Sequence, residues 1–164
     1  MKHTITVLVE NEFGVLSRVS GLFSGRGFNI ESLSVAPTLD ESISRMTIVT
    51  SGDDRILEQV TKQLNKLIDT IKVIDFTGEG EAYVERELIL IKVTAEEGTR
   101  AEVMRIADIF RANVIDVTPR SYTLEIMGSP DKIAAVIELL KPIGIKELVR
   151  TGPLALGRGS KGWR

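Results

Sequence analysis

The feature that most constrains this chain is a change of hydrophobic period that occurs in the same order in both of its halves. Segments with apolar residues at every second position predict strands, whereas segments with apolar residues three and four positions apart predict amphipathic helices. In each half the order is strand, helix, strand, strand, helix, strand. Residue identity between the halves is low, so the chain repeats a folding pattern and not a set of side chains.

The predicted elements divide evenly between the halves. In the first half the strands are 3–10, 29–36, 43–51 and 71–76, and the helices are 14–24 and 55–68. In the second half the strands are 83–94, 114–117, 122–127 and 145–149, and the helices are 100–113 and 133–140. This order predicts an α+β fold: two tandem ferredoxin-like βαββαβ units, each an antiparallel four-stranded sheet with two helices on one face. The other face of each sheet has no helix, so we expect the other unit or a second chain to cover it.

A polar, glycine-rich segment at residues 78–81 separates the two units. We therefore expect one domain over 1–77 and another over 82–150, followed by a basic, Gly-rich tail over 151–164. The tail has four glycines, three basic residues and no acid, so we expect it to be poorly ordered. An alternative is a docking tail anchored by Trp163. The tail also matches the letters of a dinucleotide-binding fingerprint, but it lacks the helix that must follow one.

Composition excludes several classes of protein. Lys and Arg total 21 and Asp and Glu total 23, a near-balance that argues against broad electrostatic binding of nucleic acid or of an anionic membrane. The absence of cysteine excludes disulfides, thiolate metal sites and cysteine nucleophiles, and it fits a reducing compartment. The single histidine, His3, has no partner at metal-ligand spacing, and no segment approaches the ~20 apolar residues of a membrane span. We expect a cytoplasmic protein with no metal site, in which His3 has a structural or surface role.

The most informative segment for function is 10–36, in which a strand ends, a turn follows and a helix begins near Val15. The start of a helix presents unpaired backbone N–H groups and a positive partial charge, and Gly14, which has no Cβ, would let a carboxylate approach them. Asn11 and Asn29 offer amide oxygens for an ammonium group. Together these groups suit a small zwitterion whose side chain lies among three apolar residues, Leu16, Ile30 and Leu33. Asparagine and glycine are also ordinary turn residues, so the pattern alone leaves both interpretations open.

Four longer segments resemble one known family. Residues 11–38 (NEFGVLSRVSGLFSGRGFNIESLSVAPT) and 44–53 (SRMTIVTSGD) are similar to the ACT domain, a βαββαβ regulatory module that often binds an amino acid. They resemble more closely the regulatory small subunit of acetolactate synthase, also called acetohydroxyacid synthase. The similarity continues in residues 84–93 (VERELILIKV) and 101–128 (AEVMRIADIFRANVIDVTPRSYTLEIMG). It covers essentially the whole chain, and motifs of this length are highly specific.

The resemblance implies a regulatory subunit with no catalytic residue and no cofactor of its own. In this family the small subunit pairs with a large catalytic subunit, a transferase that uses thiamine diphosphate, Mg²⁺ and FAD to condense two 2-oxoacids in branched-chain amino-acid biosynthesis. The small subunit stimulates that enzyme and confers feedback inhibition, usually by valine, with leucine or isoleucine as alternatives. The resemblance also implies a homodimer through the ACT domains and a second domain that dimerises or docks onto the catalytic subunit.

By matching motif positions, the resemblance implies an effector site at the interface of two protomers. One protomer would contribute the residues of the first turn, and its partner would contribute the start of the second strand. The residues are Asn11, Gly14, Val15 and Leu16 from the first and Asn29 and Ile30 from the second. Four positions around the site would shape the effector response: Ser17, Leu33, Ala36 and Gln59. The first turn of the second unit, 95–100, is acidic and would repel a carboxylate, so no effector site is expected there.

Three other functions fit the same order of elements. An acylphosphatase-like hydrolase needs an arginine in its first loop, and here the first arginine of that region is Arg18, inside the predicted helix. An RNA recognition motif stacks bases on aromatic side chains of its two central strands, and residues 3–10 and 43–51 contain none. An ACT-type amino-acid sensor for a different enzyme partner is disfavoured only by the extent of the resemblance.

Overall fold

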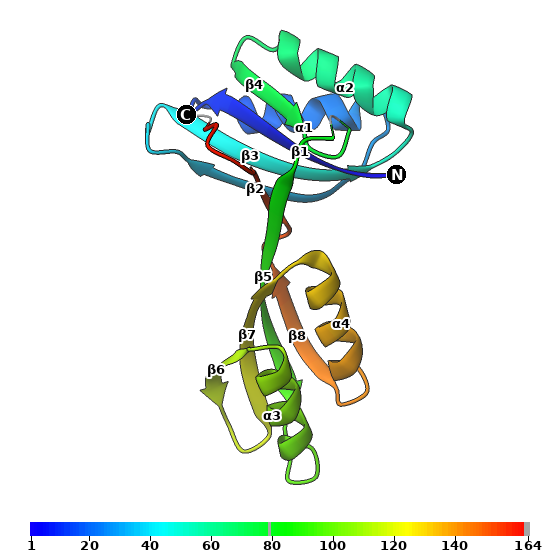
Figure 1. The fold of residues 1–164 in the computed structure, drawn as a ribbon, viewed down its shortest axis with the longest axis vertical. Helices are drawn as coiled ribbons and strands as arrows, with labels where there is room; N and C mark the ends of the chain where they lie inside the picture. The colour runs from blue at the N-terminus through cyan, green and yellow to red at the C-terminus, as the bar shows by residue number, and fades with distance from the viewer. Residues whose placement is uncertain (79, 163–164) are drawn as a thin grey trace. The chain divides into compact units, whose positions relative to one another are not determined.

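The computed structural model of the chain describes residues 1–78 and 80–162. These residues form two compact units, whose elements are labelled in Figure 1. The first unit consists of Met1–Val84 together with the C-terminal residues from Gly152 onward, and the second consists of Glu85–Thr151. The division lies close to the predicted boundary, except that the C-terminal segment belongs to the first unit.

The first unit contains six elements in the predicted order. They are β1 (Lys2–Glu10), α1 (Val15–Ser24), β2 (Ile30–Pro37), β3 (Ile43–Ser51), α2 (Asp54–Lys66) and β4 (Thr70–Asp75). The strands form one sheet in the order β2-β3-β1-β4, with antiparallel neighbours throughout (Figure 1). This confirms the predicted ferredoxin-like topology of the first half.

The main core of the first unit lies between this sheet and its two helices. Alternate residues of β1, such as Ile5 and Val7, are fully buried there, as the period of two in the sequence requires. The helices contribute apolar residues three and four positions apart, the spacing that lines one face of a helix. These residues are Val15, Val19 and Phe23 from α1 and Leu57, Val60 and Leu64 from α2.

The C-terminal segment packs on the helix-free side of the same sheet. Its strand β9 (Leu154–Gly157) pairs with β5. Ala155 of this strand is buried against Ile74 and Phe76, and the side chain of Ile74 points away from the helices. The ring of Phe76 stacks on that of Tyr83, with ring centroids 5.1 Å apart. The prediction of a poorly ordered tail is therefore wrong for this segment, because its few apolar residues find a partly uncovered apolar surface. The predicted anchor Trp163 lies outside the described residues.

The second unit repeats the arrangement. Its elements are β5 (Tyr83–Thr94), α3 (Arg100–Ile109), β6 (Asn113–Val117), β7 (Ser121–Gly128), α4 (Pro130–Leu140) and β8 (Ile145–Arg150). The strand order is β6-β7-β5-β8, which is that of the first sheet, so the predicted fold class is confirmed. The helix α3 ends at Ile109, before its predicted end at Asn113. Arg111 has a φ of +54°, a left-handed conformation that turns the chain out of the helix. Within the described residues, no helix is long and apolar enough to cross a membrane.

We predict that replacing Gly152 weakens the packing of the C-terminal segment. Gly152 has a φ of +75°, and a Cβ there would lie 2.5 Å from Cβ of Ser32. Gly159→Ala is a matched control, since Gly159 also has a left-handed φ (+91°) but a Cβ there meets no atom within 4 Å. In urea denaturation followed by circular dichroism, Gly152→Ala should cost about 1–3 kcal/mol more than Gly159→Ala. Equal losses in the two variants would mean that the C-terminal segment is not packed against β2.

Candidate functional site

The turn between β1 and α1 is held in place by the loop that precedes β3. The backbone N–H of Asn11 donates to the carbonyl oxygen of Ser42 (2.7 Å), and its side-chain Nδ2 donates to the carbonyl oxygen of Glu41 (2.9 Å). Both bonds use N–H donors, so the Oδ1 of Asn11 keeps its capacity to accept a hydrogen bond, at an exposed position. The turn therefore presents an amide oxygen in a fixed place.

Gly14 sets the geometry at the start of α1. Its φ of +83° lies in the left-handed region, which glycine adopts without strain, and it precedes the helix without a side-chain cap. Among the described residues, neither the N–H of Leu16 nor that of Ser17 donates a hydrogen bond. The start of α1 thus offers two unpaired N–H groups together with the positive end of the helix dipole, an arrangement that can hold an anion.

Arg18 lies beside Gly14 and adds a full positive charge. A Cβ on Gly14 would lie 3.1 Å from Nη1 of Arg18. The Nε and Nη2 atoms of Arg18 contact Oδ2 of the buried Asp69 at 2.8 and 2.7 Å, while the Arg18 side chain stays about half exposed. Arg18 was not among the predicted site residues. Its position four residues after Gly14, on the same face of the helix, is the signal that would have found it.

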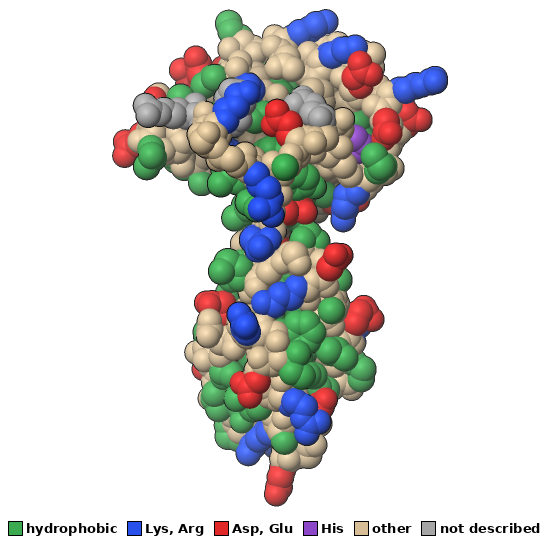
Figure 2. Space-filling view, viewed as in Figure 1, with side chains coloured by type: hydrophobic (Ala, Val, Ile, Leu, Met, Phe, Trp, Pro, Cys, Tyr) green, Lys and Arg blue, Asp and Glu red, His purple; other side chains and the backbone are tan. Residues whose placement is uncertain are grey.

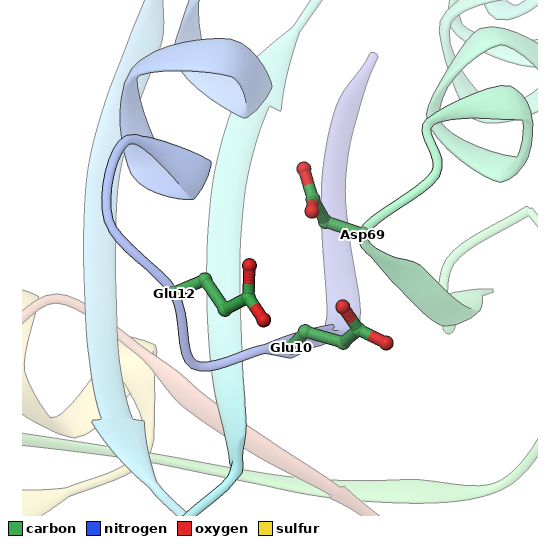
Figure 3. A group of neighbouring side chains, drawn as sticks. All are labelled: Glu10, Glu12 and Asp69. Atoms are coloured by element: carbon green, nitrogen blue, oxygen red, sulfur yellow. The ribbon is translucent and has the colours of Figure 1, made fainter.

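Three carboxylates gather next to the same turn (Figure 3). Glu10 at the end of β1, Glu12 in the turn and Asp69 before β4 have carboxylate oxygens within 4.8 Å of one another. Asp69 is paired with Arg18, whereas Glu10 and Glu12 are exposed. Such a group can hold a cation, either a divalent metal ion or an ammonium group. No metal site was predicted, and the spacing of the residues does not reveal this cluster, because Asp69 is distant from Glu10 and Glu12 along the chain.

Several of the predicted site residues lie at this end of the sheet. Asn11, Gly14, Leu16 and Ser17 all belong to the turn or to the first turn of α1, and Leu16 is 43% exposed. The side chain of Val15 is buried in the core between sheet and helices. Val15 can therefore contribute only its backbone to a ligand.

Asn29 and Ile30 lie at the opposite end of the same sheet. Ile30 is paired with Thr50, which is paired with His3, whereas the turn follows Glu10 at the other end of β1. His3 and Glu10 are seven positions apart, which is roughly 23 Å at about 3.3 Å per residue. The strand register therefore excludes a pocket that takes Asn11 and Asn29 from one chain.

The other predicted positions are spread over the first unit. Leu33 packs against the core from the middle of β2, and Gln59 is exposed on α2. Ala36 is exposed near the end of β2, where it pairs with Arg45 of β3. Arg45 also pairs with Leu8, which lies near the end of β1. Ala36 is thus placed toward the end of the sheet that carries Asn11.

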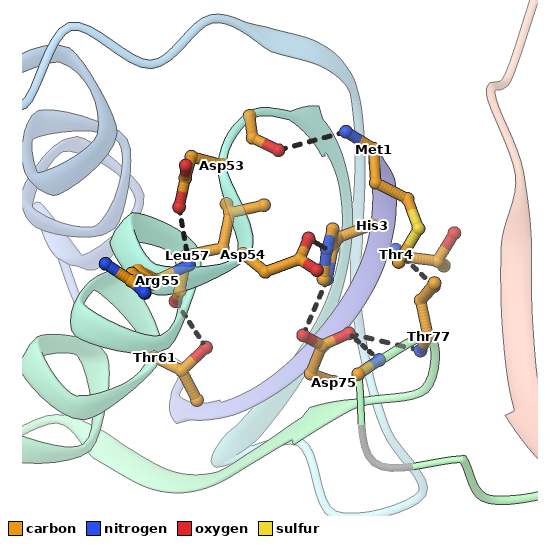
Figure 4. Close-up of polar contacts among 12 residues, drawn as sticks. Met1, His3, Thr4, Asp53, Asp54, Arg55, Leu57, Thr61, Asp75 and Thr77 are labelled. Atoms are coloured by element: carbon orange, nitrogen blue, oxygen red, sulfur yellow. Dashed lines mark hydrogen bonds and ion pairs between the residues drawn. The ribbon is translucent and has the colours of Figure 1, made fainter.

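A second polar site surrounds His3 (Figure 4). It borders a cavity of about 370 Å³ that is also lined by Asp54, Glu58 and Asp75. The ring of His3 is 4% exposed, with Nδ1 2.8 Å from Oδ2 of Asp75 and Nε2 3.1 Å from Oδ1 of Asp54. Ionised carboxylates only accept hydrogen bonds, so both bonds form together only when both ring nitrogens carry hydrogen. The predicted structural role of His3 agrees with its burial, but its partners lie too far along the chain to be read from spacing.

The helix-free face of the second sheet carries exposed apolar side chains. Leu90, Met127 and Val149 are 36%, 64% and 55% exposed, and their strand neighbours Ile89, Ile91 and Ile126 are buried in the core. Figure 2 shows exposed apolar side chains among the charged side chains of this unit. This face also holds the ion pair between Lys92 and Glu147 (3.5 Å).

Comparison with known proteins gives consistent results over nearly the whole chain. Residues 5–72 match the family model of the AHAS small subunit-like ACT domain, and residues 86–159 match that of the small subunit of acetolactate synthase. The chain is 56% identical over 161 residues to the probable acetolactate synthase small subunit of Archaeoglobus fulgidus, covering 98% of this chain and 99% of the relative. It is 57% identical over 158 residues to the acetolactate synthase small subunit of Aquifex aeolicus, covering 96% and 81%. The crystal structure of the acetolactate synthase small subunit from Thermotoga maritima matches with a TM-score of 0.86 at 37% identity, covering 98% and 99%.

We predict that His3→Leu destabilises the first unit. Leucine keeps most of the buried volume, but it leaves Oδ2 of the buried Asp75 without its hydrogen-bond donor, at a cost of about 1–3 kcal/mol. Asp54→Asn is the control, since Asp54 is 66% exposed and its bond to His3 is longer, so it should cost less than about 1 kcal/mol. Thermal and urea denaturation of the two variants would test this. Equal costs would show that the bond between His3 and Asp75 contributes little.

Proposed function

Because the chain belongs to the family of acetolactate synthase small subunits, we propose that it binds a large catalytic subunit, stimulates it and makes it sensitive to feedback inhibition by valine. The catalytic partner would use thiamine diphosphate, Mg²⁺ and FAD to condense two 2-oxoacids, and this chain would hold none of them. Leucine and isoleucine stay possible effectors, because branched side chains that differ by one methylene differ by only ~1–3 kcal/mol in a pocket. The cytoplasmic location stays a prediction.

The single observation that carries this proposal is the pairing of opposite charges at the first turn. The unpaired N–H groups of Leu16 and Ser17 and the guanidinium of Arg18 form a positive side. The carboxylates of Glu10 and Glu12 form a negative side. An amino acid carries a carboxylate and an ammonium group on the same carbon, so it is complementary to both sides at once.

A second copy of the chain would complete the site. β2 lies at the edge of its sheet, and an edge strand can be extended by a strand of another chain. In a two-fold symmetric pair joined through β2, the two copies of the strand run antiparallel. The start of β2 in one copy then lies opposite its end in the other, which brings Asn29 and Ile30 of the second copy toward the end of the sheet that carries Asn11 and Gly14. This supports a homodimer with the effector between protomers.

The exposed sheet face of the second unit is proposed as the docking surface. Leu90, Met127 and Val149 form an apolar patch on the face of the second sheet that no helix of Glu85–Thr151 covers. Such a patch is typical of a surface that a partner covers, here the catalytic subunit or a second copy. The first turn of this unit lacks the equivalents of Asn11 and Gly14, so we propose no effector site there.

We predict that Gly14→Asp abolishes valine binding. The substitution places a side chain and a negative charge where the effector carboxylate would lie, and isothermal titration should show affinity reduced by about tenfold or more. Gly80→Asp is the matched control, since Gly80 also has a left-handed φ (+66°) but a Cβ there meets no atom within 4 Å. Wild-type affinity in Gly14→Asp would place the site elsewhere.

We predict that two defective variants restore binding when mixed. Gly14→Asp and Asn29→Ala should each lose valine binding as pure dimers. A mixed dimer has two effector sites at its interface, and one of them combines an intact Gly14 with an intact Asn29, so one functional site should return. Titration of the co-refolded mixture with valine measures this recovery, and a mixture that stays inactive would argue for a site built from one chain.

We predict that Gly14→Asp separates stimulation from inhibition. Acetolactate formation by the catalytic subunit should rise when either wild type or Gly14→Asp is added, and valine should inhibit only the wild-type complex. The reason is that Gly14 lies in the first unit, whereas the proposed docking face lies in the second. If neither chain changes the activity of the catalytic subunit, the proposed regulatory role is wrong.

A further inference from the structure

Arg45 is a partly buried cation on the helix-free side of the first sheet. It lies in β3 next to Met46, which faces the helices, and it is paired with Ala36 on one side and Leu8 on the other. Its Nη2 donates to the carbonyl oxygen of Ala155 in β9 (3.0 Å). Among the described residues Arg45 forms no ion pair. A guanidinium has five N–H donors, and this bond to Ala155 is the one that Arg45 forms with the described residues.

Arg150 in the second unit shows how this fold compensates a similar cation. Its Nε and Nη2 atoms hold the two carboxylate oxygens of Glu87 at 2.7 and 3.0 Å, and Glu87 is 1% exposed. Hydrogen bonding to Glu87 raises the pKa of Arg150. Burial lowers the pKa of Arg45, and no carboxylate among the described residues is paired with it to offset the loss of water. A cation removed from water without a partner is unfavourable, so the surroundings of Arg45 are suited to an anion from outside the chain.

The space beside Arg45 is a small groove with mostly apolar walls. It has a volume of about 270 Å³ and lies between β2, β3 and β9. Its lining residues include Val35, Ala36, Arg45, Thr47, Leu154 and Ala155. Sites for drug-sized ligands have roughly 300–1,000 Å³, so this groove suits a smaller molecule. The walls favour a short branched carbon chain, and the one charged group favours an acid.

We propose that this groove, the Arg45 groove, binds a small aliphatic monocarboxylic acid that has no amino group. The carboxylate pairs with the guanidinium of Arg45, and the carbon chain lies against Val35, Ala36 and Leu154. An amino acid is disfavoured because its ammonium group would lie next to the guanidinium, and inorganic anions are disfavoured because they leave the apolar walls uncovered. The groove is separate from the proposed valine site at the start of α1, and the inference does not depend on the proposed function.

The test is a titration with isobutyrate followed by ¹H–¹⁵N correlation spectra of the full chain. Isobutyrate should cause saturable shifts in the amide signals of residues 34–36, 45–47 and 154–155. Isobutyramide, which has the same shape without the charge, should bind at least about tenfold more weakly. Valine serves as an internal comparison, because its shifts should fall on residues 11–18 and 29–30. If valine binds nowhere, the proposed function fails while the isobutyrate result still decides this inference.

Two pairs of variants test whether Arg45 binds the acid or only stabilises the fold. Arg45→Gln should lose isobutyrate binding, and Arg45→Lys should retain part of it. Since Arg45→Gln also removes the bond to Ala155, a second pair leaves Arg45 in place: Leu154→Asp puts a carboxylate into the groove, whereas Leu156→Asp makes the same change on β9 outside it. Leu154 and Leu156 are 50% and 57% exposed, so both variants should fold.

The outcomes are distinct. Loss of isobutyrate binding in Arg45→Gln and Leu154→Asp, with wild-type binding in Leu156→Asp, supports the Arg45 groove as an acid-binding site. Shifts that rise linearly without saturation, equal binding of isobutyramide, or wild-type binding in Leu154→Asp would overturn it.

Discussion

A ferredoxin-like sheet has helices on one face only. What packs on its other face determines which surfaces of this chain stay exposed for binding. In the first unit the C-terminal segment covers part of that face, with Ala155 against Ile74 and Phe76. β1 shows the effect, since it is buried on both faces along most of its length. In the second unit the corresponding face keeps Leu90, Met127 and Val149 exposed. The first sheet is therefore partly covered by its own chain, whereas the second keeps an exposed apolar surface of the kind that interaction partners cover.

The strand order also decides where a ligand can bind. Because β3 lies between β1 and β2, these two strands run parallel, and the segments that follow β1 and precede β2 lie at opposite ends of the sheet. Asn11 and Asn29 are therefore separated within one chain. The same topology leaves β2 on the edge, where an antiparallel copy would bring the two ends together. Topology thus excludes a single-chain site that combines Asn11 with Asn29, and under the proposed function a second copy supplies Asn29.

The sequence was sufficient to predict what depends on local pattern. The eight strands and four helices of the two βαββαβ units follow from hydrophobic period, and Gly14 and Asn11 stand out because a helix start is recognisable in a sequence. Contacts made only through tertiary packing could not be predicted in this way. Examples are the burial of His3 against Asp75 and the contact of Arg18 with Asp69. Strand β9 is another example, because a strand of four residues that ends in glycine is too short to show a hydrophobic period.

A site shared by two copies explains how a small effector could act on a distant partner. A ligand shifts an equilibrium only by the difference between its affinities for the two states. At an interface this difference is large, because one arrangement of the copies completes the site and any other removes half of its contacts. Couplings between sites are typically about 1–3 kcal/mol, which is similar to the loss of a single charge-assisted hydrogen bond. The free N–H groups at the start of α1 and the carboxylates of Glu10 and Glu12 can supply bonds of that kind. Under the proposed function, the regulation of a large enzyme would then depend on a turn of four residues and on the edge strand that a second copy extends.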